Sequence, residues 1–244
     1  GFPGFRALLA ISVLWPCLVS PTALAAGPLL AQPAGPGDQP AAPWRLTSLP
    51  QQAIPHTRYS VLSMDGQRVL RIDAQASYGN LVHDLQLPVA EHQLAWRWRV
   101  DVPNALADLR RKTGDDSPIK VCALFDLPLQ AVPFVERQLL RLARLRTGEH
   151  LPAATVCYVW DNQLPAGTVR DNAYTRRVRL LVLHGPEAPL RSWQAEQRDL
   201  AADFKRMFGD ETQTMPPLLG IVVAGDADNT LGSSLAFLAD IQLK

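Results

Sequence analysis

Apolar and polar residues alternate along much of the chain, in short segments separated by glycine, proline, asparagine and aspartate. In the clearest segment, 94–100, the residues Leu94, Trp96, Trp98 and Val100 share one parity, which is the pattern of a strand with one buried face. Segment 119–125 is partly apolar on both parities. A strand of that kind is covered on both faces, so we expect it near the middle of a sheet.

Segments of this kind give about ten short strands after the start of the domain. They are expected at 59–61, 70–76, 81–87, 94–100, 119–125, 155–160, 177–184, 191–196, Leu218–Ala224 and 235–243. Two helical patterns interrupt them, too few for a fold in which a helix follows most strands. The sequence therefore predicts a mostly β fold: a single domain over 44–244, built as a β-sandwich or jelly roll of about ten short antiparallel strands with two short helices.

The first helical pattern, 133–146, begins with a proline and is followed by Gly148. It has an apolar side and a basic side with the same spacing: Val135, Leu139 and Leu142, and Arg137, Arg141 and Arg144. We expect the apolar side to pack on the sheet; the alternative is a basic amphipathic helix that contacts anionic lipid or an acidic glycan. The second pattern, Leu200–Phe208, follows the N-cap residue Asp199 and should cover one end of the sandwich.

Residues 1–25 have the three parts of an export signal. Arg6 supplies positive charge, 7–19 are apolar, and Ala23 and Ala25 form a small-residue cleavage site. The alternative, a buried N-terminal helix, is disfavoured by two prolines in the segment. Residues 26–43, rich in proline, glycine and alanine, are expected to be a disordered linker. No later run is apolar enough for a transmembrane segment in the mature chain, so we expect a periplasmic or secreted protein.

Removal of the signal also changes the charge and the cysteine content. The full chain has 24 Lys and Arg against 23 Asp and Glu, and losing Arg6 makes the counts equal. A neutral chain argues against nucleic acid as a partner. Cys17 is lost with the signal, which leaves Cys122 and Cys157. In an exported protein these two could form a disulfide, and the alternative is a pair of buried free thiols.

Five polar clusters lie at the ends of predicted strands, where sandwich folds commonly carry function. The candidate binding residues are Asp115, Asp116, Trp160, Asp161, Asn162, Glu196 and Arg198, and the candidate metal ligands are Asp226, Asp228 and Asn229; Asp240 is the fifth cluster. Alternating oxygen side chains suit Ca²⁺, although the loop lacks the glycine and the glutamate of an EF-hand. A Ca²⁺ site would need Asp115, Asp116 or Asp161 close by, because one loop supplies too few oxygens.

Other roles are open for the same acidic residues. They could form turns, or pair with Arg97, Arg99, Arg177 or Arg198. Two of them could also act as acid and base in glycoside hydrolysis. The five histidines have no metal-ligand spacing, and no nucleophile elbow or phosphate-binding loop is present. The residues favour a non-catalytic protein and leave hydrolysis open.

Several motifs together resemble a family of bacterial exported proteins known only as a domain of unknown function. They are WRWRVD, GDD before an apolar strand ending in FD, CYVWDN, WQAEQRD leading into DFKRMFG, GDADNT and FLADI. The resemblance spans 44–244, and at the level of the fold it is similar to the galactose-binding-like jelly rolls of carbohydrate-binding modules. It implies a non-catalytic module that binds a carbohydrate or another cell-envelope polymer. The alternatives are a glycan-active hydrolase and a structural envelope protein without a small ligand.

Overall fold

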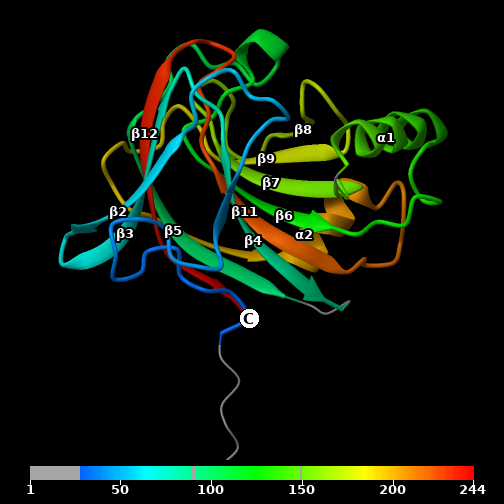
Figure 1. The fold of residues 1–244 in the computed structure, drawn as a ribbon, viewed down its shortest axis with the longest axis horizontal. Coiled ribbons are helices and arrows are strands. Elements are labelled where there is room, and N and C mark those ends of the chain that lie inside the picture. The colour runs from blue at the N-terminus through cyan, green and yellow to red at the C-terminus, as the bar shows by residue number, and fades with distance from the viewer. Residues whose placement is uncertain (1–27, 89–91, 149) are drawn as a thin grey trace, which may run out of the picture.

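The computed structural model of the protein describes residues 28–88, 92–148 and 150–244, so the predicted export signal lies outside the described residues. Within these ranges twelve strands form two sheets that pack face to face as a sandwich, with two α-helices at its margins (Figure 1). The mostly β fold class predicted from the alternating segments is confirmed.

The first sheet has seven strands. In spatial order they are β1 (Arg45–Thr47), β4 (Asn80–Leu87), β11 (Leu218–Ala224), β6 (Lys120–Phe125), β7 (Ala154–Trp160), β9 (Val178–His184) and β8 (Val169–Asp171). Neighbours are antiparallel except β7 and β9, which run parallel. The expected sandwich was antiparallel throughout. A parallel pair requires a crossover connection, and here residues 161–177 provide it and contribute the short edge strand β8.

The second sheet has five strands: β10 (Gln194–Asp199), β5 (Gln93–Val102), β12 (Ser233–Leu243), β3 (Gln67–Gln75) and β2 (Arg58–Met64). The last strand, β12, lies between β5 and β3, so the end of the chain is in the centre of this sheet. All ten expected segments are strands, although β10 begins later than expected, at Gln194. The two additional strands, β1 and β8, have three residues each, too few for an alternating pattern to be recognised.

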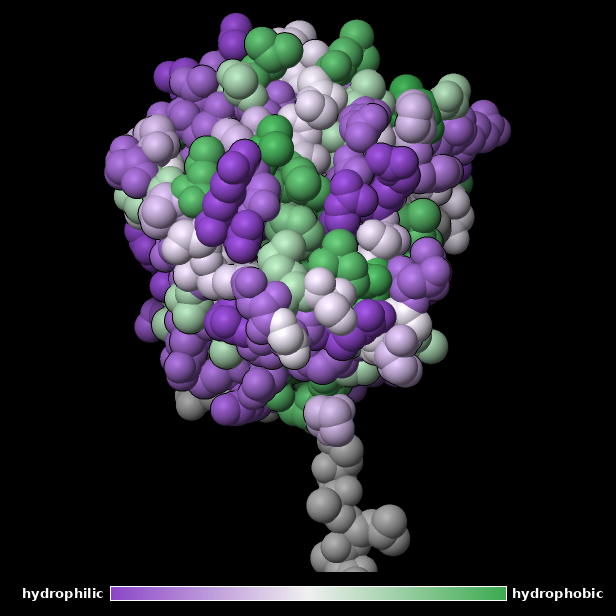
Figure 2. Space-filling view, turned by 90° about the vertical axis from the view of Figure 1, so that its left-hand side faces the viewer, coloured by the Kyte–Doolittle hydropathy of each residue, from purple (hydrophilic) through white to green (hydrophobic). Residues whose placement is uncertain are grey.

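A layer of aromatic rings fills the space between the sheets. Trp96 and Trp98 of β5 are fully buried, and their ring centroids lie 5.3 Å apart. Trp96 is 5.3 Å from Tyr158 of β7, and Trp98 is 5.9 Å from Trp160 of the same strand. The parity predicted for 94–100 is therefore correct. The opposite, outer side of the five-stranded sheet carries charged residues such as Arg97 and a small apolar cluster that includes Val69 and Phe237. Figure 2 shows the left-hand side of Figure 1, where hydrophilic residues surround a group of apolar residues near the middle of the view.

The second helix, α2 (Leu200–Phe208), matches its predicted bounds and covers one end of the core. The Asp199 carboxylate accepts a hydrogen bond from the amide N–H of Ala202 at 3.0 Å, as an N-cap residue does. Phe204 packs on Phe125 of β6, with ring centroids 4.8 Å apart.

The first helix, α1 (Phe134–Thr147), also forms where predicted, but the prediction for its orientation is wrong. Val135, Leu139 and Leu142 are exposed, and Leu140 is the one buried residue of the helix. The reason lies on its polar side. Glu136 forms an ion pair with Arg177 at the sheet edge, and the Arg144 guanidinium donates to the carbonyl oxygen of Leu151 at 2.6 and 3.0 Å. These polar contacts hold the ionic side inward, so the apolar side faces solvent.

Residues 28–43 contain no helix or strand, as expected of a linker, but they are packed on the sandwich. Leu30 is buried in the main core. The indole N–H of Trp44 donates to the Ala31 carbonyl at 2.7 Å, and the amide of Val61 donates to the Asp38 carbonyl at 2.8 Å. The composition of the segment did not show that one leucine would fix it to the core. Neither α-helix in the described ranges is long and apolar enough to cross a bilayer.

Cys122 of β6 and Cys157 of β7 are direct partners across the antiparallel pair, and they form a disulfide. The disulfide hypothesis is confirmed. A bridge between neighbouring strands is possible because their outward-facing side chains meet across the ladder.

We predict that Trp98→Ala lowers the free energy of unfolding by about 3–5 kcal/mol, because it leaves a large cavity among the other core rings. Urea denaturation of the parent and the variant measures this difference. Leu231→Ala, at a side chain that is 75% exposed, is the matched control and should change stability by less than about 0.5 kcal/mol. An equally small effect at Trp98 would contradict the assignment of this ring to the core.

Candidate binding groove

A groove lies on the outer face of the seven-stranded sheet. Strand alternation sends Val121 and Ala123 of β6 into the main core and sends Cys122 and Leu124 to the other face. There a second apolar cluster forms the floor of a cavity of about 530 Å³, within the usual size range of ligand pockets. Its apolar lining includes Cys122, Leu124, Cys157, Leu180, Val222 and Ala224. The second face of 119–125 is apolar, as predicted, but it lines a groove.

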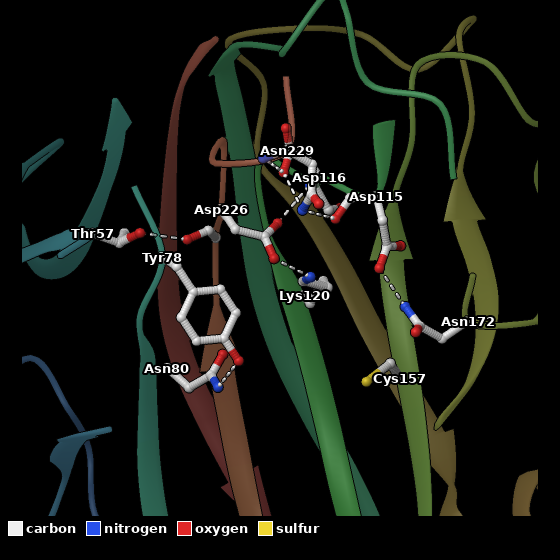
Figure 3. Close-up of polar contacts among 12 residues, drawn as sticks. Thr57, Tyr78, Asn80, Asp115, Asp116, Lys120, Cys157, Asn172, Asp226 and Asn229 are labelled. Carbon is white, nitrogen blue, oxygen red and sulfur yellow. Dashed lines mark hydrogen bonds and ion pairs between the residues drawn. The ribbon is translucent and has the colours of Figure 1, made fainter. Parts of the chain in front are cut away.

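The polar end of the groove forms where two loops meet. The loop after β11 packs against the turn before β6, and Asp116 of that turn joins them (Figure 3). One Asp116 oxygen accepts from the backbone and side-chain N–H groups of Asn229, both at 3.1 Å. The other accepts from the amide and hydroxyl of Thr230, at 2.8 and 2.5 Å. Asp116 is thus fully engaged in holding the loop.

Beside it, Lys120 and Asp226 form a buried ion pair. The Lys120 ammonium lies 2.6 Å from Asp226 Oδ2, and the Ser117 amide donates to Asp226 Oδ1 at 2.8 Å. Burial alone would lower the pKa of Lys120, but the carboxylates of Asp226 and Asp115 outweigh it and raise this pKa, so the ammonium stays charged. Figure 3 shows the pair between Tyr78 and the two carboxylates of the turn.

The loop reaches this position because residue 225 is glycine. A Cβ there would lie 2.7 Å from the Ile72 side chain and 2.7 Å from the Pro118 carbonyl oxygen. The close approach places the next residue, Asp226, within hydrogen-bonding distance of the segment that begins β6.

Asp228 and Asp115 have raised pKa values. For Asp228 the pKa rises to about 6, mainly through burial and then through the charges of Asp226 and Asp116. Its Oδ1 atom is buried and has no hydrogen-bond partner among the described residues. Burial is also the main cause of the raised pKa of Asp115, whose Oδ2 accepts from Asn172 at 2.6 Å. Asp228 therefore has one oxygen whose hydrogen-bonding capacity is unused within the described residues.

The groove contains residues that sequence reasoning missed. Tyr174, 56% exposed, places its hydroxyl 2.6 Å from Asn229 Oδ1 and so closes one wall together with Asn172. On the opposite side the Asn80 amide donates to the Tyr78 hydroxyl at 3.0 Å. One signal was available for Lys120, a lysine on the same strand face as Cys122 and Leu124. No sequence pattern marked Tyr78, Asn80, Asn172 and Tyr174, because their loop and edge positions come together only in the fold.

Two of the five predicted clusters converge here: Asp115 with Asp116, and Asp226 with Asp228 and Asn229. The others lie elsewhere in contacts of their own. Trp160 is buried in the aromatic layer and is not available to a ligand. Asp161 accepts hydrogen bonds from the amides of Gln163 and Leu164, and Asn162 follows it in the same turn. Glu196 contacts Trp98 and His184. Arg198 pairs with Asp203, and Asp240 pairs with Arg97.

The expected arginine partners of the acidic cluster have other partners. Arg99 pairs with Asp101, Arg177 with Glu211 and Arg198 with Asp203. Arg97 pairs with Asp240, so the expected arginine contact does form at the fifth predicted cluster. The cation of the cluster is Lys120. A charged side chain in a central strand is unusual unless it is paired, and Lys120 is paired with Asp226.

The same contacts limit a calcium site. Ca²⁺ takes six to eight oxygens, whereas the Asp226 carboxylate is bonded to Lys120 and Ser117, and Asn229 Oδ1 is bonded to Tyr174. Within 28–88, 92–148 and 150–244 no group of three or more His, Cys, Asp or Glu is placed to hold a metal ion. The predicted ligands do not fit Ca²⁺ in this arrangement, and the calcium hypothesis awaits a measurement of stability with and without Ca²⁺.

Comparison with known proteins gives a family and two distant structures. The family model described as "Protein of unknown function (DUF3047)" matches residues 42–242. We found no match among curated proteins. The chain is similar to the structure of TmCBM61 in complex with β-1,4-galactotriose, at 9% identity and a TM-score of 0.39, covering 90% of this chain and 99% of that one. It is also similar to Trichoderma harzianum endoglucanase 3 of family GH12, at 8% identity and 0.40, covering 84% and 99%. Likenesses this weak carry no functional argument.

The raised pKa of Asp228 predicts a pH-dependent penalty on the fold. The folded carboxyl holds its proton up to about pH 6 and the unfolded one only to about pH 4, so its contribution to stability is present below pH 4 and is lost as the pH rises through 6. Asp228→Asn removes this loss. The free energy of unfolding of this variant, measured relative to that of the parent, should therefore be about 1 kcal/mol higher at pH 7 than at pH 4. This figure allows for the partial exposure of Asp228.

Urea denaturation at both pH values measures this gain. Asp84→Asn is the control: the hydrogen bond from Arg45 holds the pKa of Asp84 below its usual value, so this carboxyl stays charged from pH 4 to pH 7 and the difference between this variant and the parent should be nearly the same at both pH values. A constant difference between Asp228→Asn and the parent at the two pH values would contradict the prediction.

Calcium binding is tested on EDTA-treated protein. If Lys120 supplies the positive charge of the cluster, millimolar Ca²⁺ leaves the melting temperature unchanged in the parent and in Asp228→Asn. A rise of several degrees in the parent that is absent from the variant would instead establish a metal site, because an ion that binds only the folded form stabilises it.

Proposed function

Because the chain belongs to the DUF3047 family, whose description assigns no activity, we propose its function from the groove: it is an exported, non-catalytic module that binds a carbohydrate or another cell-envelope polymer. The observation that carries this proposal is the pairing of an apolar floor with a polar end in one open cavity on the outer sheet face.

This chemistry suits a sugar unit, which has an apolar C–H face and a rim of hydroxyls. The floor of Leu124, Leu180 and the disulfide offers an apolar surface to the C–H face. At the polar end, amide, phenol and carboxylate groups can accept from and donate to hydroxyls, and Asp228 has an oxygen without a partner. The exposed ring of Tyr174 adds an aromatic edge to the wall.

The disulfide also supports export. Bridges between cysteines persist in oxidising compartments such as the bacterial periplasm and are rare in the cytosol. Cys122 and Cys157, the two cysteines outside the predicted signal, are bridged. A periplasmic or secreted location is therefore part of the proposal.

The engaged carboxylates favour binding over catalysis. Asp116 is bonded to the loop, Asp226 to Lys120, and Asp115 to Asn172. Glycoside hydrolysis needs one carboxyl group as acid and a second as nucleophile or base. One observation favours the alternative of a hydrolase: the Asp228 carboxyl, with a pKa of about 6, could serve as the acid.

A glycan array on the mature protein, followed by calorimetry with the best oligosaccharide, tests the proposal. Tyr174→Ala should weaken binding about tenfold, because it removes one wall of the groove. Phe134→Ala is the matched control, since this exposed aromatic residue does not line the cavity. Failure to bind any glycan or envelope polymer would refute the proposal, as would equal affinity in the Tyr174→Ala variant.

Product analysis of the bound glycan decides between the two functions. An intact glycan after prolonged incubation supports a binding module. Cleavage that is lost in Asp228→Asn and slows above about pH 6, where the acid loses its proton, would establish the hydrolase.

A further inference from the structure

The outward side of α1 is an apolar surface. Five exposed apolar residues form this surface, which is called the α1 face below. Their exposed fractions are 68% for Phe134, 68% for Val135, 61% for Leu139, 43% for Leu142 and 82% for Leu145. Isolated exposed leucines are ordinary, but five on one side of a single helix form a contiguous patch of the kind that marks an interaction surface.

The body of the protein does not cover the α1 face, because the polar side of the helix is the side that is attached. Glu136, Arg144 and their partners hold it to the sheet edge. A second cavity of about 710 Å³ lies between α1 and the segments around Pro152 and 172–178. Figure 1 shows α1 standing at the margin of the sandwich, beside β7 and β9. Polar contacts therefore hold one side of the helix to the sheet edge, and the α1 face on the other side is exposed to solvent.

The charged residues on the exposed side of α1 are arginines. Arg137, Arg141, Arg144 and Arg146 belong to the helix, and its one acid, Glu136, is paired with Arg177. Arg141 and Arg146 are exposed and form no ion pair with any residue in the described ranges. Two unpaired guanidinium groups thus accompany the apolar surface on the solvent side.

We propose that the α1 face docks on an anionic phospholipid bilayer. An amphipathic helix with leucine and phenylalanine on one side and arginines beside them lies in the plane of the membrane interface, with its apolar side in the acyl boundary. The arginines bind lipid phosphates, and their long side chains reach the headgroups from a helix that lies slightly deeper.

Charge complementarity selects this partner over a second copy of the chain. A symmetric dimer through the α1 face would place the arginines of both copies together, and like charges at an interface are unfavourable. In a bilayer rich in anionic lipid, the acyl layer can take up the apolar side chains of the helix, and the negatively charged headgroups above it can bind the arginines.

Docking would also place the groove at the membrane surface. Thr155, Asn172, Tyr174 and Val178 line both the groove and the cavity beneath α1, so the two are adjacent. This inference goes beyond glycan binding and does not depend on it.

Vesicle co-sedimentation of the mature protein is the test. The probes are vesicles of phosphatidylcholine alone and vesicles in which about a third of the lipid is phosphatidylglycerol. We expect binding to the anionic vesicles that falls steeply with salt, and little binding to the neutral ones. Arg141→Gln/Arg146→Gln should lower the partition coefficient about twenty-five-fold, since each basic residue near an anionic surface contributes a factor of about five.

Substitution of the apolar residues tests the other half of the proposal. Leu139→Ser/Leu145→Ser should lower the partition coefficient by at least about tenfold per leucine. The matched controls are Leu231→Ser, at a leucine that is 75% exposed away from the helix, and Lys205→Gln at an exposed lysine of α2. Both controls should bind as the parent does. Unchanged urea denaturation of every variant excludes unfolding as the cause.

Three results would overturn the proposal. The first is equal binding to neutral and anionic vesicles, and the second is parent-like binding by the two α1 variants. The third is a concentration-dependent dimer in size-exclusion chromatography that Leu139→Ser/Leu145→Ser abolishes, with no vesicle binding by the parent. That result would assign the α1 face to a second copy of the chain.

Discussion

The buried ion pair between Lys120 and Asp226 is the interaction on which the polar end of the groove depends. Removing two charges from water costs several kcal/mol per ion, so such a pair is stable only when it is close and its remaining atoms are bonded. Here the distance is 2.6 Å, and the Ser117 amide bonds the second oxygen of Asp226. These contacts fix the loop after β11 to the start of β6. Asp116 fixes Asn229 in the same way, so most of the acidic cluster builds the site and leaves Asp228 to act in it.

The seven-stranded sheet is apolar on both faces, and the two faces serve different purposes. The inner face packs on the aromatic layer of β5 and forms a rigid core. The outer face is only partly covered by loops, so it becomes the floor of the groove, with the disulfide of Cys122 and Cys157 as part of that floor. Function placed on a rigid sheet and the loops at its ends is the usual arrangement in sandwich folds.

Helix α1 shows how ionic contacts can reverse the expected orientation of an amphipathic helix. Burial of leucines normally decides which side faces the body. At this edge, however, Arg177 is itself buried and requires a counterion, and Glu136 supplies part of it. Arg177 shares the buried Glu211 with Arg179, so Glu136 supplies a second carboxylate to two buried guanidinium groups, and burying these charges with too few carboxylates would be costly. The apolar side is consequently left on the surface, beside the entrance to the groove, where a partner can cover it.

The sequence alone determined the ten longer strands, the two helices and the aromatic core residues of β5, because these depend on local periodicity. The alternation at Trp96 and Trp98 predicted their burial, and Asp199 predicted the start of α2. The candidate site depends on contacts between distant segments. Asp116 and Asn229 meet across more than a hundred residues, and Tyr174 joins them from a crossover loop. No local pattern encodes such distances, nor the ion pair of Glu136 with Arg177 that holds the polar side of α1 inward. Those features exist only after the two sheets have packed.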